Sequence, residues 1–235
     1  MDLKKLLAML RAFYGGAPLG DVLMLKLDAL TKASESLTKR LERLRGYAPE
    51  QELSALRRMP PGTLGHDYAA FLDANGIEPL VISPGVKARF QDAPYALRYT
   101  TTHDLHHVLT GFDAGLAREA GVLAFTVGQG SAPVSQGMLW LVRALYSLIA
   151  PTQARRIWHN VGVGLSMGKD AELVLAEPLE SYFEEPLEEV RKRLKIQDPR
   201  AAGVLPSRSS LIARLIAPTR SPRSLRAGPG GTSFV

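Results

Sequence analysis

The chain of 235 residues contains no cysteine. This absence excludes disulfide bonds, cysteine-ligated zinc, iron–sulfur clusters and thiol catalysis. It leaves the redox compartment open, because a chain without cysteine is compatible with either environment.

A hydrophobic run long enough to span a bilayer is also missing. The longest run, residues 137–151, is interrupted by Arg143 and is shorter than the about 20 apolar residues that a transmembrane helix needs. Residues 1–16 contain two lysines and an apolar run but no small-residue cleavage site, which indicates an amphipathic helix rather than a secretory signal. We therefore expect a cytoplasmic protein, for which peripheral contact with a membrane such as the inner membrane stays open.

The apolar segment 137–150 has two interpretations. The simpler is a helix buried in the core. The alternative is that it forms one wall of an apolar passage, together with residues 122–127.

The basic charge does not indicate a nucleic-acid partner. The formal net charge is +6, and residues 198–235 supply +5 of it, with six arginines against Asp198. The rest of the chain is nearly balanced, so no basic surplus on the folded body is directed at phosphate. Residues 198–235 are rich in Arg, Pro, Ser and Gly, and we expect a flexible, solvated tail. A weak contact with anionic lipid is the alternative.

Apolar residues recur at helical spacing through most of residues 1–197. No alternation of strands and helices appears, so we predict an all-α fold, a single multi-helix, bundle-like domain. A short irregular or extended segment is expected near 77–94, which holds three prolines. The segment GVGLSMGK, 162–169, has the wrong spacing for a phosphate loop, and we interpret its small residues as a place of close helix packing. The expected helices cover 21–45, 63–75, 95–110, 114–128, 134–150, 151–176 and 184–195.

Three of the five histidines lie within residues 103–107. In a helix over 95–110, His103 and His107 share one face, Asp104 lies at the edge of that face, and His106 points elsewhere. Two imidazoles and a carboxylate suit zinc or another divalent first-row metal. The alternative is a polar helix face that is rich in histidine and holds no metal.

Glu119 is the candidate for a further ligand from outside this helix. In an unbroken helix it would lie about 18 Å along the axis from His107. Gly111 can end the helix and Asp113 can cap the next one, so the chain can fold back and place Glu119 beside the histidines. The HDxxH spacing is also similar to the HExxH of zinc hydrolases, in which the acid is a general base. Aspartate is one methylene shorter than glutamate, which favours a ligand role for Asp104.

These residues also carry a family resemblance. HDLHH, eleven intervening residues and Glu119 resemble the H-D-x-x-H-x11-E signature of the coenzyme Q (ubiquinone) biosynthesis protein Coq-four family. PPGTLGHDYAAFLDANGIEP at 60–79, RYTTTHDLHHVLTG at 98–111 and EEPLEEVRKRLKI at 184–196 are similar to its flanking segments. The resemblance covers about 60–196. Arg118 stands where the family usually has glycine, and residues 198–235 and most of 1–59 lie outside its pattern.

The resemblance implies a helical domain over 1–197 that binds a metal and a prenyl lipid. Its divalent metal, commonly zinc, would be held by His103, Asp104, His107 and Glu119. It further implies a hydrophobic passage for a polyprenyl tail and, at C1 of a polyprenylated hydroxybenzoate, the replacement of carboxyl by hydroxyl. The implied partners are that benzoate or quinone intermediate, other quinone-biosynthesis enzymes and a membrane surface. A homodimer remains open.

We therefore predict a quinone-biosynthesis protein with metal-assisted decarboxylase activity, a carbon–carbon lyase. A non-catalytic prenyl-lipid-binding scaffold and a metal-dependent hydrolase are the alternatives. Arg98, five residues before His103, is a candidate to pair with the substrate carboxylate. Its alternative role is an ion pair within the bundle.

Overall fold

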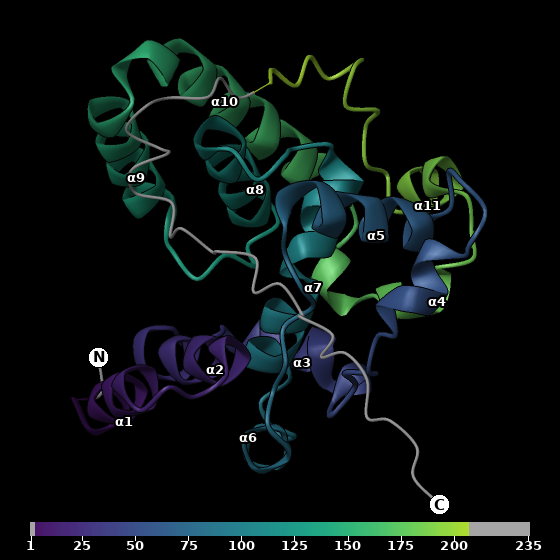
Figure 1. The fold of residues 1–235 in the computed structure, drawn as a ribbon. Coiled ribbons are helices and arrows are strands. Elements are labelled where there is room, and N and C mark those ends of the chain that lie inside the picture. The colour runs from purple at the N-terminus through teal and green to yellow at the C-terminus, as the bar shows by residue number, and fades with distance from the viewer. Residues whose placement is uncertain (1–2, 207–235) are drawn as a thin grey trace, which may run out of the picture.

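The computed structural model describes residues 3–206 and contains no strand in that range, which confirms the all-α prediction (Figure 1). Figure 1 shows α7 in the middle of the molecule, between the N-terminal helices and the helices of the C-terminal half. The helices are α1 (Leu3–Tyr14), α2 (Leu19–Leu30), α3 (Glu35–Leu41), α4 (Leu53–Arg57), α5 (Leu64–Asn75), α6 (Pro84–Arg89), α7 (Pro94–Thr110), α8 (Leu116–Gly128), α9 (Gln136–Ile149), α10 (Ala154–Asp170) and α11 (Leu187–Arg193).

The continuous helix predicted over 21–45 is wrong, because the chain forms α2 and α3 with a break between them. Thr31 is extended, and the Ser34 hydroxyl accepts a hydrogen bond from the backbone N–H of Leu37 at 3.2 Å. A serine oxygen in this position satisfies a first-turn N–H that would otherwise have no partner. The cap therefore starts a new helix where apolar periodicity alone indicates continuity.

The segment 77–94 is irregular only in part, since it contains α6. Pro84 is the first residue of α6, a position in which proline loses no intrahelical hydrogen bond. The backbone N–H of Ser83 donates to Asp21 at 2.8 Å, which ties the loop before α6 to α2.

The helix α7 is the centre of the core. Most of its residues are buried, and it contacts α2, α3, α5 and α8. The largest apolar cluster joins α7 to α5, α8 and α11 through Leu72, Leu105, Leu109, Phe125 and Val190. A helix buried on several sides holds its side chains in fixed positions, so the histidines of α7 stand on a rigid support.

The helices α8 and α10 approach closely through glycine. A methyl group at Gly164 would collide with the carbonyl oxygen of Gly121, and one at Gly168 would collide with that of Phe125. The interpretation of 162–169 as a place of close helix packing is confirmed. This contact fixes α8, whose first turn carries the metal-ligand candidate Glu119.

The prediction of a buried core helix over 137–150 is wrong. Within α9 only Leu139 is buried, whereas Leu141 and Leu148 are 62% and 79% exposed. The helix packs on α8 and α10, and all its residues except Leu139 are partly or fully exposed. Among residues 3–206, no helix is long and apolar enough to cross a membrane.

The packed chain continues past residue 197, where the flexible tail was expected to begin. His159 Nε2 is 2.9 Å from the Gly203 carbonyl oxygen, and the Asn160 amide donates to the Leu205 carbonyl at 2.9 Å. Residues 203–205 therefore lie against α10. The rest of the predicted tail, 207–235, is outside the described residues.

We expect Gly168→Ala to lower the free energy of unfolding by about 1–3 kcal/mol, because the added methyl meets backbone that cannot move aside easily. Gly162→Ala is the matched control in the same helix, where the added methyl meets nothing within 4 Å. Alanine there should be neutral or stabilise the protein by up to about 1 kcal/mol. Urea unfolding of both variants checks this, and equal effects would contradict the packing argument.

Candidate metal centre

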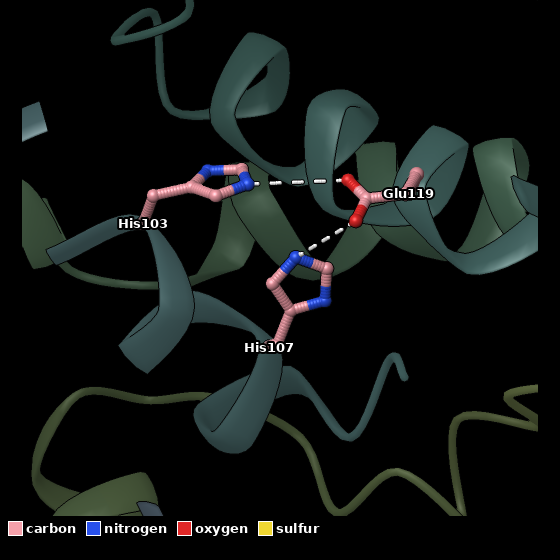
Figure 2. Close-up of side chains that lie close together, drawn as sticks. All are labelled: His103, His107 and Glu119. Carbon is pink, nitrogen blue, oxygen red and sulfur yellow. Dashed lines mark ion pairs between the residues drawn. The ribbon is translucent and has the colours of Figure 1, made fainter. Parts of the chain in front are cut away.

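His103 and His107 lie one turn apart on the same face of α7. Their ring centroids are 5.1 Å apart in an edge-to-face arrangement. Figure 2 shows both imidazoles turned toward Glu119 on the neighbouring helix. The spacing of four residues thus produces the pair that the sequence predicts.

The turn between α7 and α8 brings Glu119 to this pair. Gly111 ends α7 in the left-handed conformation, with φ +70°. The Asp113 carboxylate then accepts a hydrogen bond from the backbone N–H of Gly115 at 2.9 Å. The next helix starts at Leu116, so Glu119 lies in its first turn. The predicted return of the chain at Gly111–Asp113 is confirmed.

The three side chains present their ligand atoms at distances that suit one metal ion. His107 Nε2 lies 3.4 Å from Glu119 Oε1, and His103 Nε2 lies 3.9 Å from Glu119 Oε2. One ligand atom from each of the three side chains lies within 4.8 Å of the others. Ligands at about 2.0–2.2 Å from a tetrahedral zinc ion are about 3.3–3.6 Å from one another. The cluster is therefore close to a coordinating geometry.

The orientation of His107 is fixed from behind. Its Nδ1 lies 2.9 Å from the carbonyl oxygen of Phe112, and its ring stacks on Phe71 with centroids 5.2 Å apart. A backbone carbonyl requires the proton on Nδ1, which leaves the Nε2 lone pair directed at Glu119. His103 stacks on Tyr99 at 6.0 Å, and its buried Nδ1 has no partner among the described residues.

The environment favours the neutral form of both histidines, which is the form that binds a metal. Burial lowers the pKa of His103, and the neighbouring His107 lowers it further. Burial also lowers the pKa of His107 and raises that of Glu119. Asp104 adds negative charge that acts on all three groups. A carboxylate with a raised pKa beside neutral imidazoles is stabilised by a cation.

Asp104, the fourth predicted ligand, lies outside this cluster. One residue along a helix turns a side chain by about 100°, and Asp104 lines a neighbouring cavity of about 330 Å³ together with Tyr68 and Thr100. Its ligand role stays a prediction. The Asp104 carboxylate acts on groups of both places. Its negative charge opposes the lowering of the His107 pKa by burial, and it adds to the raising of the Tyr68 pKa by burial.

Arg98 is fully buried inside the bundle. Its guanidinium lies 2.7 Å from Glu180 Oε1 and donates to the Glu177 carbonyl at 2.9 Å. It also stacks over Tyr47, with 5.2 Å to the ring centroid. These contacts are those of the ion-pair alternative, and the substrate-binding role stays untested.

Two supporting groups of the site are absent from the sequence argument. Tyr99 lies four residues before His103, so the helical spacing that pairs the histidines could also have found it. The Phe112 carbonyl has no such signal, because any residue carries a backbone carbonyl and only the turn directs this one to His107.

The family model of "Coenzyme Q (ubiquinone) biosynthesis protein Coq4" matches residues 35–200 of the chain. The chain belongs to the Coq4 family. The match includes α7, α8 and the turn between them, so the candidate metal centre lies entirely inside the family region. The resemblance on residues 60–196 is confirmed and extended toward the N-terminus.

Relatives of the Coq4 family share this region at modest identity. The chain is 30% identical over 188 residues to the mitochondrial ubiquinone biosynthesis protein COQ4 homolog of Danio rerio, covering 78% of this chain and 68% of that protein. It is 28% identical over 176 residues to that of Mus musculus, covering 73% and 64%. A crystal structure of a Nostoc punctiforme protein assigned to ubiquinone biosynthesis has a TM-score of 0.60 and 25% identity, covering 83% of this chain and 98% of that one.

We expect His107→Ala to weaken zinc binding at least about a hundredfold, because it removes a ligand atom that is already oriented. His106→Gln is the control, since His106 Nδ1 is engaged by the Thr102 carbonyl at 2.8 Å. Competition with a chromogenic chelator measures both affinities. Equal losses in the two variants would argue against a site built from His107.

The acid stability of the metal-free protein should depend on His106. Burial lowers the pKa of His106 to about 3 from an ordinary value of 6.5. Between these values the unfolded chain binds a proton that the folded chain does not, so the free energy of unfolding falls as the pH falls. His106→Gln should reduce this slope by up to about 1.4 kcal/mol per pH unit. Urea unfolding from about pH 7.5 to 4.5 measures it, and an unchanged slope would contradict the assignment.

Proposed function

We propose that this Coq4-family protein takes part in ubiquinone (prenylquinone) biosynthesis as an oxidative decarboxylase. It would act at C1 of a polyprenylated hydroxybenzoate head group, with zinc held by His103, Asp104, His107 and Glu119. The observation that carries the proposal is the convergence of two imidazoles and a carboxylate beside a cavity lined by Asp104.

The residues of this site fit a divalent ion by their chemistry. The two Nε2 atoms and the Glu119 carboxylate converge, and the carbonyl of Phe112 fixes the tautomer of His107. Zinc, when bound, supplies a Lewis acid for carboxylate and phenol oxygens and has no redox chemistry of its own. Asp104 would complete the ligand set from the side of the cavity.

The reaction needs an oxidant besides the protein. Replacing carboxyl by hydroxyl releases carbon dioxide and takes one oxygen atom from dioxygen, while the other oxygen atom is reduced to water by an external reductant. The chain's own residues would orient the head group and offset the charge that develops on its oxygens. The nearby Tyr68 hydroxyl, whose pKa is raised by burial and by Asp104, would stay protonated and available to donate.

The partners follow from the same proposal. The ligand would be a polyprenylated benzoate or quinone intermediate, and other quinone-biosynthesis enzymes would supply and consume it. The names of the vertebrate relatives place those proteins in mitochondria, and the sequence predicts a cytoplasmic protein peripheral to the inner membrane. For this chain we propose a position at the surface of the membrane in which the prenylated intermediate is dissolved.

A non-catalytic prenyl-lipid-binding scaffold is the second candidate. It is favoured by the exposed apolar side of α9, which presents Leu141 and Leu148 to the surroundings. In that case the metal centre would hold a head group without converting it.

A Glu119→Gln variant should lose bound metal and at least about a hundredfold of the decarboxylation rate. The assay supplies a prenylated hydroxybenzoate labelled at the carboxyl carbon and measures labelled carbon dioxide together with quinone in cells. Glu184→Gln, at an exposed position, is the matched control. Asp104→Asn tests the fourth ligand in the same assay. Metal loss with unchanged quinone production would exclude the enzymatic proposal in favour of the scaffold, and retained metal with ester or peptide cleavage would indicate a hydrolase.

A further inference from the structure

Large apolar side chains are exposed on the helix pair α9–α10, and three of them, Leu141, Leu145 and Leu148, share one side of α9 by their helical spacing. Figure 1 shows α9 at the outer edge of the molecule. We define the α9–α10 face by its exposed members, which are Met138, Trp140, Leu141, Leu145, Leu148 and Trp158. Large apolar side chains exposed close together are typical of a site that contacts a protein or a membrane.

The segment that forms this face carries charge of one sign. Residues 120–169 contain no aspartate or glutamate, whereas they contain Arg143, Arg155, Arg156 and Lys169. Arg155 is exposed in the first turn of α10, where the chain comes from the end of α9. The face is therefore apolar with basic groups beside it. It complements a layer that has an apolar interior and anionic groups at its surface.

An arginine between two tryptophans joins the two helices of the face. The Arg143 guanidinium lies 3.9 Å from the ring centroid of Trp140 and 3.4 Å from that of Trp158. Trp158 Nε1 donates to the Ser147 hydroxyl at 3.1 Å. Tryptophan prefers the boundary between hydrocarbon and water, since its ring is apolar and its N–H is polar. Both tryptophans of the chain are in this face.

We propose that the α9–α10 face docks on an anionic lipid bilayer, with Leu141, Leu145 and Leu148 in the acyl region and the tryptophan–arginine stack at the headgroups. The proposed function includes contact with a membrane, and this proposal rests on it by naming the surface that makes the contact. It does not depend on the metal chemistry. Because α8 packs on both α9 and α10, docking would hold Glu119 one helix away from the bilayer side.

Two alternatives fit these observations less well: a second copy of the chain as the partner of this face, and α1 as the surface that contacts the membrane. A second copy of the chain would set the same positive groups against each other without a nearby acid to pair with them. The helix α1 also exposes Leu3, Leu7 and Leu10. Near α1, however, Lys5 pairs with Asp28 at 2.6 Å, so acidic groups accompany its basic ones.

The test uses the full-length protein and phosphatidylcholine vesicles with and without phosphatidylglycerol. Flotation measures binding, and tryptophan emission reports on the face itself, because both tryptophans belong to it. We expect flotation and a blue shift of the emission with anionic vesicles, and weaker effects with neutral ones. Brominated acyl chains should quench the emission.

The variant Leu141→Ser/Leu145→Ser/Leu148→Ser should bind anionic vesicles at least about tenfold more weakly, since it removes apolar area that would enter the bilayer. These side chains are exposed, so circular dichroism melting should be unchanged. The matched control Leu3→Ser/Leu7→Ser/Leu10→Ser on α1 should bind within about twofold of the original protein.

Several results would overturn the proposal. The first is that the original protein does not float with anionic vesicles, and the second is that only the α1 variant loses flotation. The third is flotation without a shift of the tryptophan emission, which binding through the arginine-rich segment 207–235 would give. A dimer that the α9 variant abolishes, without vesicle binding by the original protein, would assign the face to self-association. Zinc content measured on the same samples separates these outcomes from failure of the metal site.

Discussion

The left-handed turn at Gly111 is the constraint on which the candidate metal centre depends. A side chain there is disfavoured by φ +70°, and a Cβ would also collide with Pro199. The turn ends α7 directly after the histidines and lets α8 begin beside them, so that His103, His107 and Glu119 face one another. Ligands from two helices then meet without a long loop, whose ordering would cost conformational entropy.

The same turn connects the site to the C-terminal segment. Arg118 donates to the Gly111 carbonyl at 3.2 Å and to the Leu205 carbonyl at 3.1 Å, and it pairs with Asp113. The arginine that departs from the family's usual glycine thus holds the turn and residues 198–206 together. Substituting it would loosen both at once, since its three contacts share one guanidinium.

The molecule separates a rigid ligand support from an outward apolar surface. Glycine contacts hold α10 tightly on α8, and α9 covers the pair on one side only. The ligand helices therefore lie inside the packed body, whereas the leucines and tryptophans of the α9–α10 face do not. The proposed function would use both, because metal ligands must be held in fixed positions and a prenyl tail needs apolar surroundings.

The sequence by itself determined the helical class, the His103–His107 pair and the return to Glu119, because these follow from local periodicity and from a glycine that ends a helix. Only the tertiary structure decided the position of Asp104, the buried pairing of Arg98 with Glu180 and the exposure of α9. Local spacing fixes the direction of a side chain around its own helix. It does not determine which neighbouring element, if any, buries that side chain, since this depends on how distant segments pack.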